Sequence, residues 1–161
     1  HAAHERLLYD ALKAGAQECA QQLLEPVAVT LGAEEYAALL PELDTLRQAG
    51  FDLEDFGGKA VLVRGVPMLL DGAETAPLVQ EIAGGLAAGR REITTDKLDW
   101  IYHSTACRAA IKGGDLSHPA ELASMAERVL LSDDVRTCPH GRPVCFELTR
   151  RELEKRFGRT K

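Results

Sequence analysis

The sequence predicts a mixed α/β fold of the α+β kind, and three observations support this class. Near the start of the chain, Glu5, Leu8 and Leu12 recur at the spacing of one helix face. Alternating apolar and polar residues at 51–56 and 60–64 flank a Gly-Gly pair, which is typical of a β-hairpin. Helical periodicity then returns in the second half of the chain.

The first half of the chain predicts five elements in the order β-α-β-β-α after an opening helix. The opening helix is expected over 2–24, and a strand follows over 27–31. A second helix is predicted over 33–49, because Gly50 stands where a glycine commonly ends a helix. The two hairpin strands come next, and residues 74–88 are expected to form another helix.

The second half begins with a charged stretch at 89–96, which we interpret as a crossing between lobes. A helix is predicted over 98–112, with Cys107 on its apolar face. Pro119 is typical of a helix start, and this helix should run to about residue 131. Residues 144–148 alternate as a strand and are one candidate face for a dimer interface, and residues 152–157 predict a short terminal helix.

We expect these elements to form two lobes. A chain of 161 residues can bury one sizeable core or two small lobes that share an interface. Residues 1–20 and 93–161 would make the first lobe. Residues 21–92 would be a regulatory lobe of βαββα order inserted into it.

The net negative charge of the chain limits its expected partners. Its net charge is −6 and its pI is about 5.4, whereas phosphate binding depends on clustered Lys and Arg. We therefore expect this chain to bind DNA only weakly on its own. A zinc-binding transcription regulator fits poorly because the sequence lacks a basic recognition helix. The sequence shows no bilayer-spanning run and no signal peptide, so no membrane partner is expected.

Four cysteines, in a chain of ordinary apolar content, do not resemble a secreted disulfide framework. In an intracellular protein, a Cys near a His is more often a metal ligand or an inert core residue. Cys19 and Cys145 are expected to be small core residues, and the expected location is the cytoplasm.

Cys138 and His140 form the most informative pair in the sequence. They stand two residues apart in Cys-Pro-His-Gly-Arg-Pro at 138–143, where two prolines and a glycine favour a turn. A thiolate and an imidazole on a stiff turn can supply half of a transition-metal site, and a tetrahedral site needs further ligands from elsewhere.

Three other side chains are candidates for the missing ligands. His1 and Glu5 lie one helical turn apart on the same face, although such a pair is more often a solvated surface. Cys107 taken by itself is more often a core residue. Together with Cys138 and His140 these residues offer nitrogen, oxygen and sulfur donors suited to zinc or another late divalent ion. Spacing does not bring them into contact.

Four motifs resemble those of the C-terminal domain of the mismatch repair endonuclease MutL. The sequence at 1–10 is similar to the end of that family's Asp-Gln-His-Ala-x-x-Glu-x-x-x-x-Glu motif. Ala-Cys-Arg at 106–108, the turn at 138–143 and Phe-Gly-Arg at 157–159 resemble the family's other motifs, in the same order. The motifs extend over nearly the whole chain, which makes the match specific.

The resemblance implies a function for the candidate residues. A divalent-metal site, for zinc or manganese, would be formed by five residues: His1, Glu5, Cys107, Cys138 and His140. The family nicks one DNA strand with metal-activated water, and Glu5 would be a catalytic residue of that site. The resemblance also implies a homodimer formed through the first lobe. Arg159 matches the family's terminal Phe-x-Arg and is a candidate contact for a phosphate or for the active site, with a solvated tail as the alternative.

Two departures from the family motif affect the expected activity. The motif's Asp and Gln would precede His1 and are not in this sequence, and Asp10 replaces its second Glu. We therefore expect this chain to bind metal but not to cut DNA by itself. The resemblance further implies an N-terminal ATPase domain outside this sequence, so ATP is not expected to bind here. It also implies that the mismatch recognition protein MutS interacts with the full-length protein.

Gln-Gln-Leu-Leu-Glu-Pro at 21–26 resembles the motif with which MutL docks on the replication sliding clamp. Gln21, Leu24 and Pro26 would enter a pocket of the clamp as part of an extended peptide. The alternative is a helix end followed by a proline that stops it. Clamp binding would bring a weakly DNA-binding nuclease to its substrate by raising its effective concentration.

A second function remains open at the level of sequence. The chain could be a non-catalytic dimerisation and partner-docking module whose metal site is structural. A closed site with four protein ligands would favour that alternative. The carboxylate of Glu5 beside Cys and His ligands, and the full set of motifs, favour the nuclease.

Overall fold

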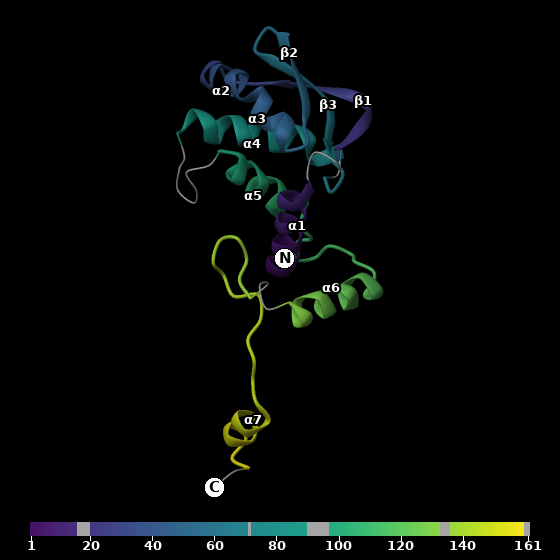
Figure 1. Cartoon of the computed structure of the whole chain (residues 1–161), viewed down its shortest axis with the longest axis vertical. Coiled ribbons are helices and arrows are strands. Elements are labelled where there is room, and N and C mark those ends of the chain that lie inside the picture. The colour runs from purple at the N-terminus through teal and green to yellow at the C-terminus, as the bar shows by residue number, and fades with distance from the viewer. Residues whose placement is uncertain (16–19, 71, 90–96, 133–135, 160–161) are drawn as a thin grey trace.

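A three-stranded antiparallel sheet and the helices packed on it form the upper part of the molecule (Figure 1). The computed structural model describes residues 1–15, 20–70, 72–89, 97–132 and 136–159. The strands lie in the order β1-β3-β2, and they are β1 (Ala20–Thr30), β2 (Asp52–Gly57) and β3 (Ala60–Pro67). The α+β class predicted from the sequence is confirmed.

Helices cover this sheet and complete the main core. They are α2 (Ala33–Leu39), the 3-10 turn η2 (Leu40–Glu42), α3 (Leu43–Gln48), the 3-10 turn η3 (Gly72–Glu74) and α4 (Thr75–Ala87). Phe51, Val61 and Ile82 are buried in this core, and Ile101 joins it from the next helix. The β-α-β-β-α order expected for 21–92 is therefore present, whereas the division of the chain into two lobes stays a prediction.

Two helices that are far apart in the sequence lie side by side below the sheet (Figure 1). These are α1 (Ala2–Gly15) and α5 (Lys97–Ala109). Leu8 and Leu12 of α1 pack on Ala106 of α5 and on Ala110 just after it, forming a second small core. This pairing matters for function because it brings the start of the chain next to Cys107.

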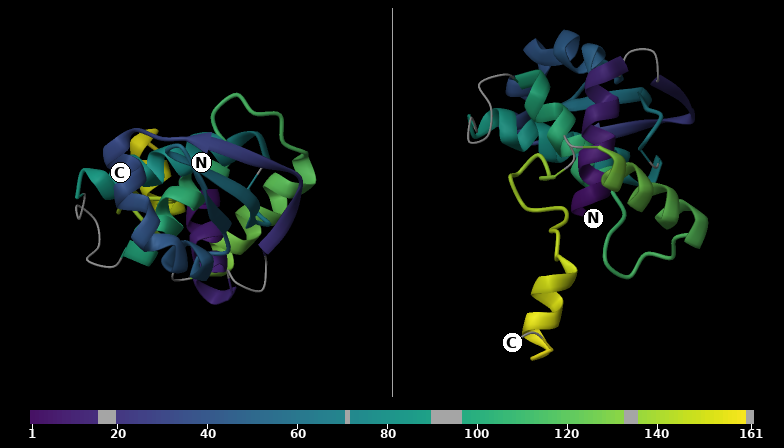
Figure 2. Two further views of the ribbon diagram at one scale, coloured as in Figure 1. Left: turned by 90° about the horizontal axis from the view of Figure 1, so that it is seen from above. Right: turned by 60° about the horizontal axis from the view of Figure 1, so that its bottom comes forward.

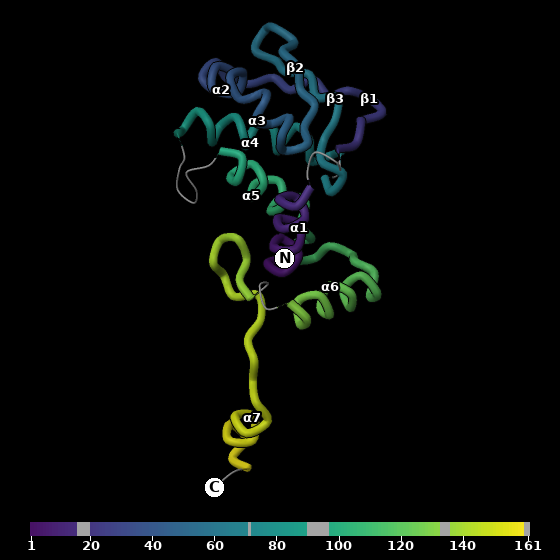
Figure 3. Tube along the Cα trace, viewed as in Figure 1, coloured from purple at the N-terminus to yellow at the C-terminus, as the bar shows by residue number. Residues whose placement is uncertain are grey.

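The last part of the chain extends away from the body of the molecule. Helix α6 (Pro119–Leu131) lies below α1, and α7 (Arg150–Arg156) stands apart in Figure 1, in the right-hand view of Figure 2 and in the trace of Figure 3. Neither helix buries a residue. We call residues 144–159 the C-terminal arm. Among the described helices none is both long and apolar enough to span a membrane.

Two predicted helices are wrong in extent. The helix expected over 2–24 ends at Gly15, and β1 begins at Ala20, because residues 20–22 pair with residues 65–67 of β3. Pairing with a neighbouring strand thus overrides local helix propensity. The helix expected over 33–49 is broken at Pro41, which lies at the start of η2 and lacks the N–H that a continuous helix needs.

Other predicted elements are confirmed. Gly50 follows α3 with a positive φ of 89°, as expected for a glycine that ends a helix. The hairpin turns through residues 57–59 between β2 and β3. Helix α6 has the predicted bounds, with His118 as its N-cap and Pro119 in its first turn. The helix expected over 98–112 is α5, which ends earlier, at Ala109.

The strand predicted over 144–148 is wrong. Alternation alone does not make a strand, because the backbone also needs a neighbouring strand to pair with, and these residues have none within the described parts of the chain. The segment is instead an extended connection to α7, in which Cys145 is exposed rather than a core residue. The crossing predicted at 89–96 and Cys19 fall, apart from residue 89, outside the described residues.

Candidate metal centre

The carboxylate of Glu5 lies at the centre of the candidate site. Glu5 is on the first turns of α1 and is only 3% exposed. Its Oε1 lies 2.7 Å from Nδ1 of His140, and its Oε2 lies 3.8 Å from Nε2 of His1. Oε1 nevertheless has no partner in hydrogen-bond geometry among the described residues. A buried carboxylate between two imidazoles is an arrangement that a cation would stabilise.

The turn at 137–143 brings Cys138 and His140 to this carboxylate. An isolated bridge joins Thr137 to Pro143, and the N–H of Cys138 donates to the carbonyl of Arg142 at 2.8 Å. Gly141 adopts a φ of 76°, which closes the turn. The turn buries Cys138, and the ligand atoms of Glu5, Cys138 and His140 all lie within 4.8 Å of one another.

His1 and Cys107 lie on the other side of Glu5. Nδ1 of His1 is 2.9 Å from the carbonyl oxygen of Ile111, which fixes the ring proton on Nδ1. Nε2 therefore carries a lone pair, and it lies 3.9 Å from Sγ of Cys107. Burial, with the nearby Glu5 charge, raises the pKa of the Cys107 thiol. A bound cation would have the opposite effect and favour the thiolate.

The geometry thus brings the five predicted side chains into one neighbourhood. Oε1 of Glu5 faces His140 and Oε2 faces His1. Cys138 belongs to the tight group with Glu5 and His140, and Cys107 lies beside His1. Thiolate, imidazole and carboxylate donors are the set that zinc prefers, and carboxylate and imidazole also suit manganese. The residues present fit a divalent ion, and their role as ligands stays a prediction.

A sixth side chain, His103, was missed by the sequence interpretation. It lies on α5, one turn before Cys107, and is buried against Tyr9 and His140, with ring centroids 4.4 Å and 5.5 Å away. Burial lowers the pKa of His103, against the opposing charge of Asp99. The spacing of Asp99, His103 and Cys107 along one helix face was a signal that could have identified it.

A cleft of about 490 Å³ opens beside the cluster. It runs between α4 and α5 and is lined by Glu81 and Trp100 together with His103, Cys107 and His140. Two glycines of α4, Gly84 and Gly85, form its opposite wall. Solvent and small ligands can therefore approach the candidate centre from the α4 side.

Comparison with known proteins identifies the family. Residues 1–116 match the family model described as the MutL C terminal dimerisation domain. The chain belongs to this family. It is 40% identical to the DNA mismatch repair protein MutL of Heliobacterium modesticaldum and 36% identical to that of Pelotomaculum thermopropionicum, over 99% of the chain in each case. The family predicted from the motifs is thereby confirmed.

The chain spans about a quarter of the length of these MutL relatives, covering 25% of the first and 27% of the second. The MutL protein of Methanoculleus marisnigri is 34% identical, again over 99% of the chain, and 28% of its length is covered. The similarity therefore extends through the C-terminal arm, beyond the part that the family model matches.

Three further residues of the MutL motifs lie away from the cluster. Asp10, which stands in place of the motif's second Glu, accepts a hydrogen bond from Nε of Arg6 at 2.9 Å. His4 lies between His1 and Glu5 in the sequence, and its Nδ1 accepts a hydrogen bond from the N–H of Ile111 at 3.1 Å. Arg159 is exposed and follows α7, the helix that stands apart from the body of the molecule in Figure 1.

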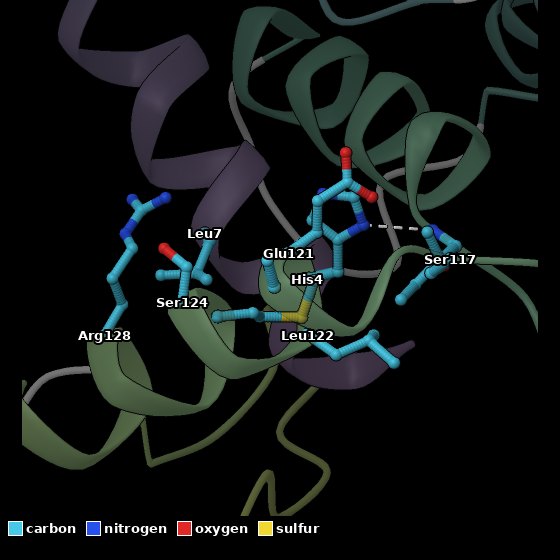
Figure 4. A pocket seen from close by; sticks show the side chains of 10 residues that line it. His4, Leu7, Ser117, Glu121, Leu122, Ser124 and Arg128 are labelled. Atoms are coloured by element: carbon cyan, nitrogen blue, oxygen red, sulfur yellow. Dashed lines mark hydrogen bonds between the residues drawn. The ribbon is translucent and has the colours of Figure 1, made fainter.

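His4 lines a separate pocket of about 520 Å³ between α1 and α6 (Figure 4). In Figure 4 its imidazole lies close to Glu121, while Leu122 and Arg128 border the pocket from α6. Burial lowers the pKa of His4. No metal-ligand cluster of the described residues includes this pocket.

The predicted clamp-binding residues lie at an irregularity of β1. The pairing of β1 with β3 shifts between Gln22 and Val27, so residues 23–26 leave the regular ladder. Leu24 is fully exposed there, whereas Nε2 of Gln21 donates to the carbonyl of Leu70 at 3.1 Å. The alternative of a helix end before Pro26 is wrong, because this segment is part of β1.

Proposed function

We propose that this chain is the metal-binding and dimerising part of a mismatch repair protein that nicks DNA. The observation that carries this proposal is the buried Glu5 carboxylate between two pairs of Cys and His side chains. Membership of the MutL family and relatives named DNA mismatch repair proteins support it. The acidic charge of the chain fits a nuclease that depends on partners to reach DNA.

The five side chains have distinct roles in this proposal. Cys138 and His140 would hold one ion against Oε1 of Glu5, and His1 and Cys107 would present donors to Oε2. Glu5 would be a carboxylate ligand of the bound metal. When bound, zinc or manganese would supply a water of lowered pKa and neutralise charge on the phosphate. The cleft beside His140 is the route by which a phosphodiester could reach this site.

Metal content tests the ligand assignment directly. We expect elemental analysis of the purified chain to find a divalent metal, and the Cys138→Ala and His140→Ala variants to lose most of it, because each removes a donor from the tightest group. Cys145→Ala is the matched control, since Cys145 is an exposed cysteine outside that group. Equal metal content in all four proteins would remove the basis of the assignment.

Nicking of supercoiled plasmid by the full-length protein with manganese tests the activity. Glu5→Gln keeps the size of the side chain but removes its charge, so the variant should lose nicking by about a hundredfold or more if the carboxylate holds the ion. Arg6→Gln, on the next position of α1 and paired with Asp10, should retain activity. Full nicking by Glu5→Gln would contradict the proposed mechanism.

Docking on the sliding clamp through Gln21, Leu24 and Pro26 is part of the proposal. The exposed Leu24 in an irregular, extended segment supports it, because clamp-type pockets receive an extended peptide. Leu24→Ala should abolish stimulation of nicking by the clamp and leave metal content unchanged. Phe56→Ala, which alters an exposed apolar residue on the hairpin, is the control. Stimulation that survives Leu24→Ala would make the motif structural.

One observation favours the second candidate, a non-catalytic dimerisation and docking module. Exposed leucines on α6 and Phe146 on the arm form apolar surface that this chain leaves uncovered. In that case the metal would only fix the turn at 137–143. The Glu5→Gln variant distinguishes the two candidates. If the metal site is structural, the substitution should lower stability and metal content, and the wild type should have no nicking activity to lose.

A further inference from the structure

His103 carries a buried ring nitrogen that has no hydrogen-bond partner in the described parts of the chain. The side chain is 5% exposed, and its Nδ1 has no hydrogen bond within the described residues. Buried polar atoms in folded proteins nearly always have a partner, so this nitrogen needs an explanation. His103 lies outside the group formed by Glu5, Cys138 and His140, and its ring centroid is 5.5 Å from that of His140.

The surroundings of His103 determine which nitrogen holds its proton. Its Nε2 lies 3.6 Å from Oδ2 of Asp99 on the preceding turn of α5. That carboxylate is held in place by the hydroxyl of Tyr9 and by Nζ of Lys13, which is 2.9 Å from Oδ1. A fixed negative charge beside Nε2 favours the proton on that atom. Nδ1 then carries a lone pair and can only accept a hydrogen bond.

His140 is the neighbour that can use this acceptor. Its Nδ1 faces Oε1 of Glu5 at 2.7 Å without hydrogen-bond geometry, as expected of two atoms that converge on a common ion. Its Nε2 then carries the proton. A histidine that binds a metal usually donates its other ring N–H to an acceptor, which fixes the ring and raises its basicity. The ring of His103, tilted by 59° to that of His140, is the adjacent imidazole.

We propose that His103 is a positioning residue of the metal centre, whose Nδ1 accepts a hydrogen bond from Nε2 of His140 when an ion is bound. Asp99, Tyr9 and Lys13 form the fixed support behind it. The inference rests on the proposed metal site. His103 would act through His140 and would not itself be a ligand of the ion.

Cobalt binding to the full chain tests this role without relying on nicking. Co²⁺ bound by a cysteine thiolate absorbs light, so its binding can be followed by absorbance. A titration in competition with a chelator then gives the affinity of the chain for Co²⁺. His103→Phe keeps a ring between Tyr9 and His140 but has no acceptor, and we expect affinity to fall by about 10- to 100-fold. His103→Gln keeps an acceptor oxygen and should recover part of the loss. His4→Gln, which removes an imidazole from α1 outside the cluster, should bind as the wild type does.

The outcomes separate this inference from the proposed function. Wild-type protein that binds no Co²⁺ contradicts the metal site itself. Wild-type binding with equal affinity in His103→Phe contradicts only the role of His103, and so does an equal loss in His103→Phe and His103→Gln.

A measurement on the wild-type chain covers the case in which a variant does not fold. Long-range ¹H–¹⁵N NMR reports which ring nitrogen of each histidine is protonated. We expect the proton of His103 on Nε2, and we expect the signal of its unprotonated Nδ1 to shift towards that of a hydrogen-bonded nitrogen when Zn²⁺ is added. A proton on Nδ1 of His103 in the zinc-bound chain would overturn the proposal.

Discussion

The sheet with α2 to α4 and the region from α6 through the C-terminal arm use apolar residues in opposite ways. In the sheet region, residues such as Phe51, Val61 and Leu78 are almost completely buried in one core. Helices α6 and α7 bury no residue, although Leu130, Leu131 and Phe146 in this second region are large and apolar. Phe146 is 83% exposed.

The difference separates a region whose apolar residues form a core from a region whose apolar side chains are left for a partner to cover. A region with its own core can fold by itself, whereas contiguous exposed apolar surface marks an interaction site. The family is described as a dimerisation domain, and its model matches residues 1–116, which end before α6. We propose that a second copy of the chain also covers the exposed leucines of α6 and Phe146 of the arm. The candidate metal centre lies at the boundary, because Glu5 belongs to the packed part and His140 to the turn that precedes the arm.

The largest expected effect is on the core of the sheet region. Phe51 is 1% exposed and Phe56, on the same hairpin, is 61% exposed. Phe51→Ala should lower the free energy of unfolding by about 3–5 kcal/mol, because it removes buried apolar area and leaves a cavity. Phe56→Ala should change it by less than about 0.5 kcal/mol. Urea unfolding followed by circular dichroism measures both, and similar losses would contradict the contrast between the regions.

The next effect concerns association. Replacing both Leu130 and Leu131 on α6 by Ser should weaken dimerisation by about tenfold or more, because two large side chains would no longer be buried against the partner. Sedimentation equilibrium measures the dissociation constant. Met68→Ser removes an exposed apolar residue from the sheet region and should leave it unchanged. An unchanged dissociation constant in the Leu130 and Leu131 double variant would mean that the dimer interface lies elsewhere on the chain.

The sequence predicted best those elements that local signals define. Two glycines defined the hairpin, and Pro119 defined the start of α6. It failed where a distant partner decides the structure. Residues 20–24 read as a continuation of a helix, and pairing with β3 makes the first of them a strand. Residues 144–148 alternate like a strand, and within the described residues they lack one to pair with.

In the candidate site, too, the sequence predicted what local signals define and missed what depends on distant parts of the chain. Cys138 and His140 could be recognised from their own turn, since the spacing and the prolines are local. Their approach to Glu5 could not be read from spacing, because those residues are far apart in sequence and meet only when α1 packs on α5. The resemblance to MutL supplied that step. His103 belongs to no quoted motif, so only the packed structure identified it.

A smaller effect is expected from the charge of the arm. The arm, residues 144–159, contains five Lys and Arg and three Asp and Glu, although the whole chain carries −6. We expect the double variant Arg151→Ala, Arg156→Ala to bind DNA more weakly and to lower the salt slope of binding by about one for each lost phosphate contact. Fluorescence anisotropy at several salt concentrations measures both. Arg47→Ala in the sheet region is the control, and an equal change there would contradict a specific role for the arm.

The smallest effect is expected at the contact between α1 and α6, where His4 lies close to Glu121 and Arg128 borders the same pocket (Figure 4). Burial holds the pKa of His4 below its usual value of 6.5, and Arg128 acts in the same direction while Glu121 opposes it. The unfolded chain therefore binds the proton more readily than the folded one. The contribution of His4 to stability is present above about pH 6.5 and is lost as the pH falls below that value.

The His4→Gln variant distinguishes the effect of protonating His4 from the effect of its hydrogen bond. Nδ1 of His4 accepts from the N–H of Ile111, and the amide oxygen of His4→Gln can do the same without titrating. The free energy of unfolding in urea, measured with a chelator at about pH 5.5 and pH 7.5, should differ less in His4→Gln than in the wild type. An unchanged difference would mean that other groups govern the acid sensitivity, and that the contact between α1 and α6 does not depend on a neutral His4.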